Sequence, residues 1–95
     1  MPLDALRLYR QGILDLAAEH GMRNVRVFGS IARGDDSPYS DVDFLVDVEQ
    51  GRTLLDVIAL EQNLERLLGR KVDVLTVGGL SPYLHHRIVT EATAL

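Results

Sequence analysis

The chain has 95 residues, of which 46% are hydrophobic, and its formal net charge is -4 at pH 7. This composition fits one globular domain spanning residues 1–95, and the acidic balance disfavours direct nucleic-acid binding. The chain has no cysteine and no apolar run close to the ~20 residues of a membrane-spanning helix, so we expect no disulfide, no thiolate metal site, no membrane partner and a cytoplasmic location.

The first predicted element is a long helix, and a short strand follows it. From Leu3 to about His20 the apolar residues recur at the spacing of one helical face. Gly21 is a suitable stop, because glycine readily takes the left-handed backbone conformation found at helix ends. Val25–Phe28 is predicted to be a short strand.

A glycine and a serine interrupt this strand, and a polar loop leads to the next one. We expect Ser30 to cap one helical turn over Ile31–Arg33. Residues 34–40 are rich in Gly, Asp, Ser and Pro, which predicts a loop. Asp41–Val48 is the second predicted strand.

A second long helix, a third strand and a final helix complete the chain. Thr53 is a suitable N-cap for a helix over Leu54–Leu68, whose apolar residues form one stripe. Val72–Val77 is the third predicted strand. A serine followed by a proline is typical of a helix start, and we expect a final helix over Ser81–Leu95.

This order of elements predicts an α/β (α+β) domain in two layers, with a small three-stranded sheet flanked by helices. The second and third strands are joined by a long helix, so we expect them to be parallel with a right-handed crossover. The first strand has to run antiparallel to the second if the Gly29–Ser30 turn is to reach the same edge as Asp41. The predicted sheet is therefore mixed, with strand order 1-2-3.

Two aspartates open the second strand with one residue between them. Asp41 and Asp43 point to the same face, where their like charges repel unless a cation lies between them. Oxygen ligands select hard divalent ions such as Mg²⁺ or Mn²⁺. Parallel pairing would bring Asp73 beside them, which makes three candidate carboxylates for one or two metal ions. In the competing interpretation, Asp73 lies at a strand edge and pairs with Arg70 or Lys71.

The Gly29–Ser30 turn supplies the second half of the candidate site. Free backbone N–H groups at such a turn, beside a helix N-terminus, form a phosphate-binding cradle. Metal ions next to a phosphate cradle indicate phosphoryl or nucleotidyl transfer, in which positioning and charge neutralisation do most of the catalysis. The alternative is a metal-binding module without enzymatic activity, which would bind Mg²⁺ without preferring a nucleoside triphosphate.

The compound pattern consists of Gly29-Ser30-x-Ala32-Arg33-Gly34, then Ser40-Asp41-Val42-Asp43, then a lone Asp73 on the next strand. In these strand and loop contexts it resembles the motif of the DNA polymerase beta-type nucleotidyltransferase superfamily. The resemblance covers about Val25 to Val77, and the flanking helices fit the nucleotidyltransferase fold as well. The chain departs from the family in size, because most members carry a second domain for the acceptor.

The resemblance implies a role for each candidate residue. Gly29–Ser30 would contact the triphosphate of the nucleotide. Asp41 and Asp43 would bind two Mg²⁺ ions, and Asp73 would complete the metal site and help to activate the attacking hydroxyl. Arg33 occupies the family's arginine position, where it would contact phosphate or brace the loop.

A catalytic core of this length resembles the minimal nucleotidyltransferases (MNT), which are paired with a small helical HEPN protein. The resemblance implies an antitoxin that transfers AMP from ATP to a tyrosine of a HEPN ribonuclease toxin and so blocks it. Two further alternatives stay open at this point. One is an antitoxin that acts by binding alone, and the other is a nucleotidyltransferase for a small-molecule acceptor such as an aminoglycoside.

Overall fold

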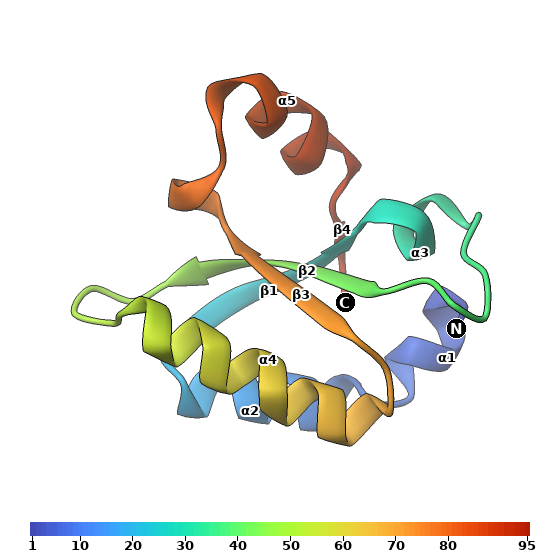
Figure 1. Cartoon of the computed structure of the whole chain (residues 1–95), viewed down its shortest axis with the longest axis horizontal. Coiled ribbons are helices and arrows are strands. Elements are labelled where there is room, and N and C mark those ends of the chain that lie inside the picture. Colours follow the sequence, from blue (N-terminus) through green and yellow to red (C-terminus); the bar gives the residue numbers. More distant parts are fainter.

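The computed structural model describes all 95 residues. Its helices are α1 (Leu3–Arg7), α2 (Arg10–Glu19), α3 (Gly29–Arg33), α4 (Leu54–Leu68) and α5 (Pro82–Glu91), and a short 3-10 turn spans Val77–Gly79. Its strands are β1 (Met22–Phe28), β2 (Val42–Val48), β3 (Val72–Thr76) and β4 (Thr93–Ala94). The strands form one mixed sheet in the order β3-β2-β1-β4 (Figure 1).

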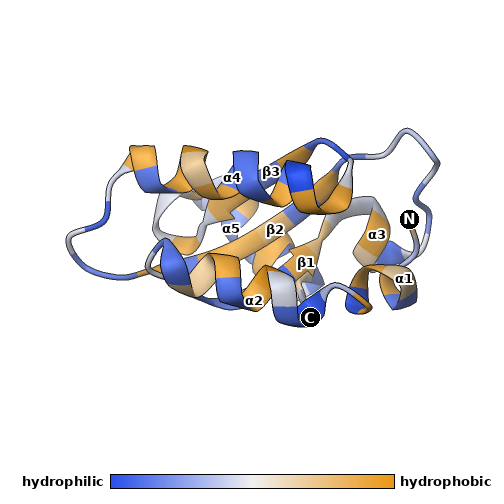
Figure 2. Cartoon of the chain, turned by 90° about the horizontal axis from the view of Figure 1, so that it is seen from below, coloured by the Kyte–Doolittle hydropathy of each residue, from blue (hydrophilic) through white to orange (hydrophobic).

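Helices α2 and α4 lie side by side on one face of the sheet, whereas α5 stands on the other side, next to α3 (Figures 1 and 2). Figure 2 views the molecule from the side of α2 and α4, and the strand β2 behind them is apolar along most of its length. The core fills this layer, and its largest buried side chains include Leu6, Ile13, Met22, Ile31, Phe44, Leu60 and Leu64. None of the helices is both long and apolar enough to cross a membrane.

Helix α4 shows how local sequence determines one of these elements. Its buried residues recur at helical spacing, at Val57, Leu60, Leu64 and Leu68. Thr53 is the N-cap, and its backbone N–H donates a hydrogen bond of 2.8 Å to the carboxylate of Asp56. Gly69 follows the helix with a left-handed φ of 66°. The predicted bounds of this helix are confirmed.

The predicted strand directions are also confirmed. β1 pairs with β2 in an antiparallel manner, and β2 pairs with β3 in a parallel manner across the α4 crossover. The C-terminal end of β1 therefore meets the N-terminal ends of β2 and β3 at one end of the sheet. This arrangement gives the α/β fold class that the sequence predicts, and it positions the candidate site.

Two glutamates of α4 protect the outer edge of β3. The carboxylate of Glu61 accepts a hydrogen bond of 2.8 Å from the backbone N–H of Val74, and that of Glu65 accepts one of 3.1 Å from Val72. Unpaired N–H groups on an edge strand are a template for unwanted strand pairing. The crossover helix α4 thus also supplies hydrogen-bond acceptors for backbone N–H groups at the outer edge of β3.

The number of strands differs from the prediction, because the final helix does not continue to Leu95. Helix α5 ends at Glu91, and Ala92 takes an extended conformation with a ψ of 134°. The next two residues form β4, which pairs with β1 and adds a fourth strand to the predicted three. A strand of two residues carries no periodicity, so its formation depends on the free edge of β1 rather than on local sequence.

The predicted helix from Leu3 to His20 is in fact two helices. The chain turns at Leu8, which is exposed, and its backbone N–H bonds to the carbonyl three residues earlier, at Ala5, instead of four. This tighter turn redirects the chain. It places Leu6 in the core and lets Arg7 donate hydrogen bonds to the carbonyls of the last two residues. These contacts are distant in sequence, so the periodicity of the segment does not reveal the break.

Candidate active site

The pairing of the strands brings the predicted carboxylates to one end of the sheet. Asp43 is the second residue of β2, where it lies opposite Phe28 of β1 and beside Asp73 of β3. Asp41 directly precedes the strand. Residues two apart on a strand point to the same face, so Asp41 and Asp43 share one side of the sheet. The predicted placement of Asp73 next to this pair is confirmed by the register.

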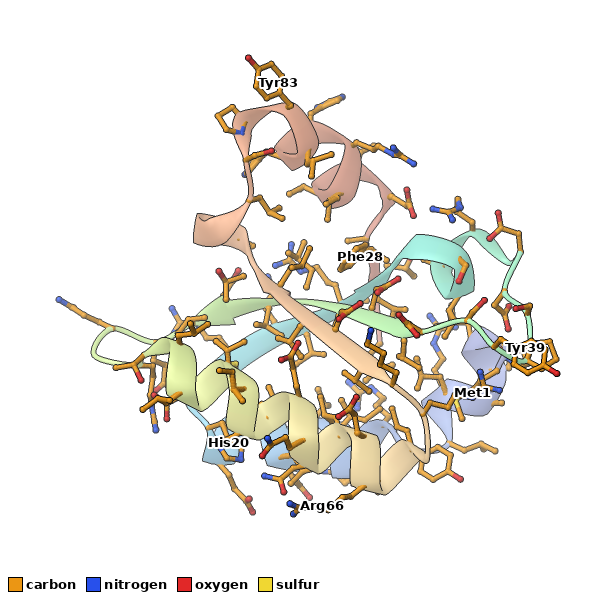
Figure 3. All side chains as sticks on the ribbon, in the orientation of Figure 1. Met1, His20, Phe28, Tyr39, Arg66 and Tyr83 are labelled. Atoms are coloured by element: carbon orange, nitrogen blue, oxygen red, sulfur yellow. The ribbon has the colours of Figure 1, made fainter.

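A cleft of about 400 Å³ lies at these strand ends. Among the residues that line it are most of the predicted site residues, namely Gly29, Ser30, Arg33, Asp41 and Asp43. Asp73 is not one of the lining residues. The opposite wall comes from α5, through Leu84, Arg87, Ile88 and Glu91. Figure 3 shows Phe28 between the sheet and α5, and Tyr83 on the outer side of that helix.

Gly29 joins β1 to α3 in a backbone conformation that favours glycine. Its φ is 74°, and a Cβ atom at this position would overlap the Oδ2 atom of Asp43. The missing side chain therefore lets the carboxylate of Asp43 lie against the turn. Helix α3 begins at Gly29 with Phe28 as its N-cap, so the prediction that Ser30 caps this helix is wrong. Ser30 lies inside the first turn instead.

Asp43 is a half-buried carboxylate with two others nearby. Partial burial, followed by the charges of Asp73 and Asp41, raises the pKa of Asp43 from 3.8 to about 6, while the guanidinium of Arg33 acts in the opposite direction. Each effect that raises this pKa is a cost of ionisation that a bound cation would offset. Oxygen-only donors suit a hard divalent ion, so the chemistry of the site fits Mg²⁺ or Mn²⁺.

Asp41 and Asp43 are the residues that would hold such an ion. The Oδ2 atom of Asp41 lies 3.9 Å from Nζ of Lys71, and the Asp41 side chain is 39% exposed. An ion pair this long and exposed contributes little, so it presents no obstacle to a metal ion. No three Asp, Glu, His or Cys side chains are grouped closely enough in the structure to hold a metal ion. A role of Asp73 in metal binding therefore stays a prediction.

The donors of the predicted phosphate cradle are engaged within the chain. The backbone N–H of Gly29 donates to Oε1 of Glu91 at 2.8 Å, and Nη1 of Arg33 donates to the same oxygen at 2.7 Å. Nε of Arg33 donates to Asp35 at 3.2 Å. These carboxylates, Asp35 above all, raise the pKa of Arg33 further above its usual value. Arg33 thus braces the loop that follows it and also faces the cleft.

The contribution of α5 to the cleft is not among the features predicted from the sequence. Its cleft residues are spaced three or four apart on one face of the helix, at Leu84, Arg87, Ile88 and Glu91. A stripe that mixes apolar residues with a cation and a carboxylate is a signal that the sequence does contain. Its meaning depends on the position of α5 across the cleft, and that position is visible only in three dimensions.

Known proteins share this fold and much of this sequence. A family model described as a nucleotidyltransferase domain matches residues 10–95. The protein adenylyltransferase MntA of Thermococcus cleftensis is 40% identical over 77 residues, which are 81% of this chain and 78% of that protein. A solved structure of a proposed minimal nucleotidyltransferase is 48% identical, with a TM-score of 0.89 over 100% of this chain and 97% of the other.

A more distant likeness extends to a complex of two proteins. In it, a tri-AMPylated HEPN toxin of Shewanella oneidensis is bound to an MNT antitoxin. The matching chain has a TM-score of 0.71 over 93% of this chain and 69% of its own length. The sequence identity is 21%, so this likeness shows a shared fold alone.

Proposed function

Because the chain belongs to the nucleotidyltransferase domain family, we propose that it is an antitoxin and a Mg²⁺-dependent protein adenylyltransferase. In this proposal it transfers AMP from ATP to a tyrosine of a HEPN-family ribonuclease toxin and so neutralises the toxin. The name of the Thermococcus cleftensis relative supports protein adenylylation. The Shewanella oneidensis complex, which has the same fold, supports a HEPN protein as the acceptor.

The observation that carries the proposal is a pair of carboxylates beside a Gly-Ser turn in one cleft. Asp41, Asp43 and Gly29–Ser30 all line it. When bound at the two aspartates, Mg²⁺ would supply the positive charge that neutralises a triphosphate. The Gly29 N–H and the Ser30 hydroxyl are donors for phosphate oxygens, and Arg33 adds a fixed positive charge.

The proposed reaction joins the phenol oxygen of a tyrosine to the α-phosphorus of ATP. The bond from the α-phosphorus to the oxygen that bridges to the β-phosphorus breaks, and pyrophosphate leaves with the electron pair. The tyrosine gives up its proton, and we assign this proton to the carboxylate of Asp73, which lies beside Asp43 in the sheet. Asp41 and Asp43 serve charge neutralisation in this scheme.

In the proposal, the acceptor tyrosine comes from the partner protein. Tyr83 and Leu84 of α5 are 94% and 46% exposed, and Leu84 also lines the cleft. Aromatic and aliphatic side chains are common at the centre of protein interfaces. A partner that contacts α5 would therefore be next to the nucleotide.

The double substitution Asp41→Asn/Asp43→Asn should abolish AMP transfer without unfolding the protein, because neutral amides replace the anionic ligands of the ion. The measurement is the intact mass of the candidate HEPN toxin after incubation with this protein, Mg²⁺ and ATP. The wild type should add one or more AMP units. The control Asp4→Asn/Asp15→Asn removes the same charge from exposed positions outside the cleft and should transfer like the wild type.

Other outcomes of the same assay contradict the proposal in distinct ways. Transfer that persists in the Asp41→Asn/Asp43→Asn protein overturns the metal role of both residues. A tight toxin complex and neutralisation without any mass shift point to an antitoxin that acts by binding alone. Transfer of AMP to an aminoglycoside without any protein partner points to a small-molecule acceptor.

A further inference from the structure

We propose that Glu91 sets the nucleotide affinity of the site, because its carboxylate occupies the donors that a triphosphate needs. The inference deepens the proposed function and rests on it. Glu91 is the last residue of α5 and contacts both Gly29 and Arg33, which lie about sixty residues earlier in the chain. Nucleotide binding is then an exchange, in which a phosphate oxygen takes the place of a carboxylate oxygen.

A single carboxylate oxygen accepts both hydrogen bonds. Oε1 of Glu91 lies 2.8 Å from the Gly29 nitrogen and 2.7 Å from Nη1 of Arg33. The Glu91 side chain is 19% exposed and that of Arg33 is 43% exposed, so Glu91 is partly shielded from water while Arg33 also reaches solvent. Hydrogen bonds to ionised groups are shorter and about twice as strong as neutral ones. Glu91 is therefore bound as an anion in the cleft and is not a solvated surface charge.

The charges around Glu91 make this contact replaceable. The same cleft contains Asp41 and Asp43, which repel a third carboxylate, and only Arg33 pairs with Glu91. A triphosphate presents the same kind of oxygen to the same donors. Since the triphosphate would bind together with a divalent cation, the two aspartates would repel it less than they repel Glu91. The exchange thus favours the nucleotide once the cation is present.

The side chain of Glu91 can move out of the site by rotation, without movement of helix α5. The backbone of this region is held by the hydrogen bond from Ala92 to Ile88 and by the pairing of β4 with β1. Arg87 lies one helical turn before Glu91, lines the same cleft and takes part in none of the ion pairs of the structure. Side chains four apart on a helix can meet, so rotation of Glu91 alone can bring it to Arg87.

The substitution Glu91→Gln tests the inference, because it keeps the shape of the side chain and removes its charge. We expect the full-length variant to bind ATP and tripolyphosphate, each with Mg²⁺ present, about tenfold more tightly than the wild type. Isothermal titration calorimetry measures both affinities. Glu49→Gln is the matched control, since Glu49 is exposed and follows the far end of β2. Its affinities should equal those of the wild type.

The possible results separate this inference from the proposed function. Equal binding by the wild type and Glu91→Gln overturns the inference, and so does weaker binding by the variant, because Glu91 would then position Arg33 for phosphate. Absence of tripolyphosphate binding in both proteins with Mg²⁺ present also overturns it, since the freed donors should hold that anion. Tighter binding without AMP transfer to a HEPN toxin supports the inference and contradicts the proposed acceptor.

A measurement on the unaltered chain guards against a folding defect in the variant. The carboxyl carbon of Glu91 should change its NMR chemical shift when the wild-type protein is saturated with tripolyphosphate in the presence of Mg²⁺, while that of Glu49 stays constant. An unchanged Glu91 signal at saturation overturns the exchange of partners.

Discussion

At the scale of single residues, Asp43 leaves no room for a side chain at Gly29. The turn at Gly29 has a φ of 74°, and the Asp43 carboxylate fills the space where a Cβ atom would lie. Gly34 also has a positive φ, of 79°, but no atom lies within 4 Å of its Cβ position. The two glycines therefore separate the effect of backbone conformation from that of steric overlap.

Gly29→Ala should lower the free energy of unfolding by about 3 kcal/mol or more, because overlap with Asp43 adds to the left-handed backbone cost. Gly34→Ala should lower it by only about 1 to 2 kcal/mol, since the backbone cost acts alone. Urea denaturation measures both values, and nucleotide binding should weaken only in Gly29→Ala. Equal losses of stability in the two variants would show that the Asp43 carboxylate moves away from the added methyl group at little energetic cost.

The raised pKa of Asp43 makes the stability of the metal-free protein depend on pH. The pKa of Asp43 is about 6 in the folded state, whereas the pKa of the free side chain is 3.8. Ionisation of Asp43 therefore lowers the free energy of unfolding. This loss of stability develops in the window between these two pKa values, as the pH rises. Below the window both states are protonated and the loss disappears.

Asp43→Asn should accordingly raise the free energy of unfolding by about 1 to 2 kcal/mol above pH 6, after allowance for solvent screening at a half-buried site. This gain should fade towards about pH 4. Denaturation of both proteins in EDTA across this range is the measurement. Added Mg²⁺ should stabilise the wild type and not the variant. A gain that is constant with pH would assign the effect to something other than charge.

At the scale of elements, α4 depends on a local cap. The Thr53 N–H donates to the Asp56 carboxylate at the start of the helix, so Asp56→Ala should cost about 1 kcal/mol. Asp4→Ala is a suitable control, because Asp4 is also in the first turn of a helix but is fully exposed. Thermal denaturation of both variants compares them. A similar shift in Tm for the two would mean that the cap bond contributes nothing.

The same element shows why part of the fold could be predicted from the sequence. Thr53 and Gly69 mark the ends of α4 through contacts within a few residues, and the parallel direction of β2 and β3 follows from one crossover. The break near Leu8 and the strand β4 depend on contacts across nearly the whole chain, such as those of Arg7 with the C-terminal carbonyls. Patterns of local periodicity contain no information about such contacts.

The candidate site divides in the same way. Asp41, Asp43 and the Gly29–Ser30 turn were found because spacing on a strand and the composition of a turn determine where their polar groups point. The role of Glu91 is not predicted from the sequence, since it comes from contacts with Gly29 and Arg33 about sixty residues earlier in the chain. The structure supplies the second wall of the cleft and with it the internal partner of the phosphate donors.

At the scale of the whole molecule, Arg7 connects the first helix to the last strand. Its Nε and Nη2 atoms donate to the carbonyls of Leu95 and Ala94 at 3.1 Å each. Arg7→Ala should therefore speed hydrogen exchange in β4 by about tenfold or more. The control is Arg10→Ala, because Arg10 is exposed at the start of α2. Unchanged exchange in Arg7→Ala would show that pairing with β1 alone holds the strand.

The order of α5 after the other cleft elements in the chain has a consequence for biosynthesis. Ribosomes release a protein from its N-terminus, so the segments that contain Gly29, Arg33 and the aspartates leave the exit tunnel before α5 does. A nascent chain at that stage has neither the second wall of the cleft nor the Glu91 carboxylate. Its phosphate donors are free of their internal partner until α5 has been translated and packed, so the cleft takes its finished form only after that helix has emerged.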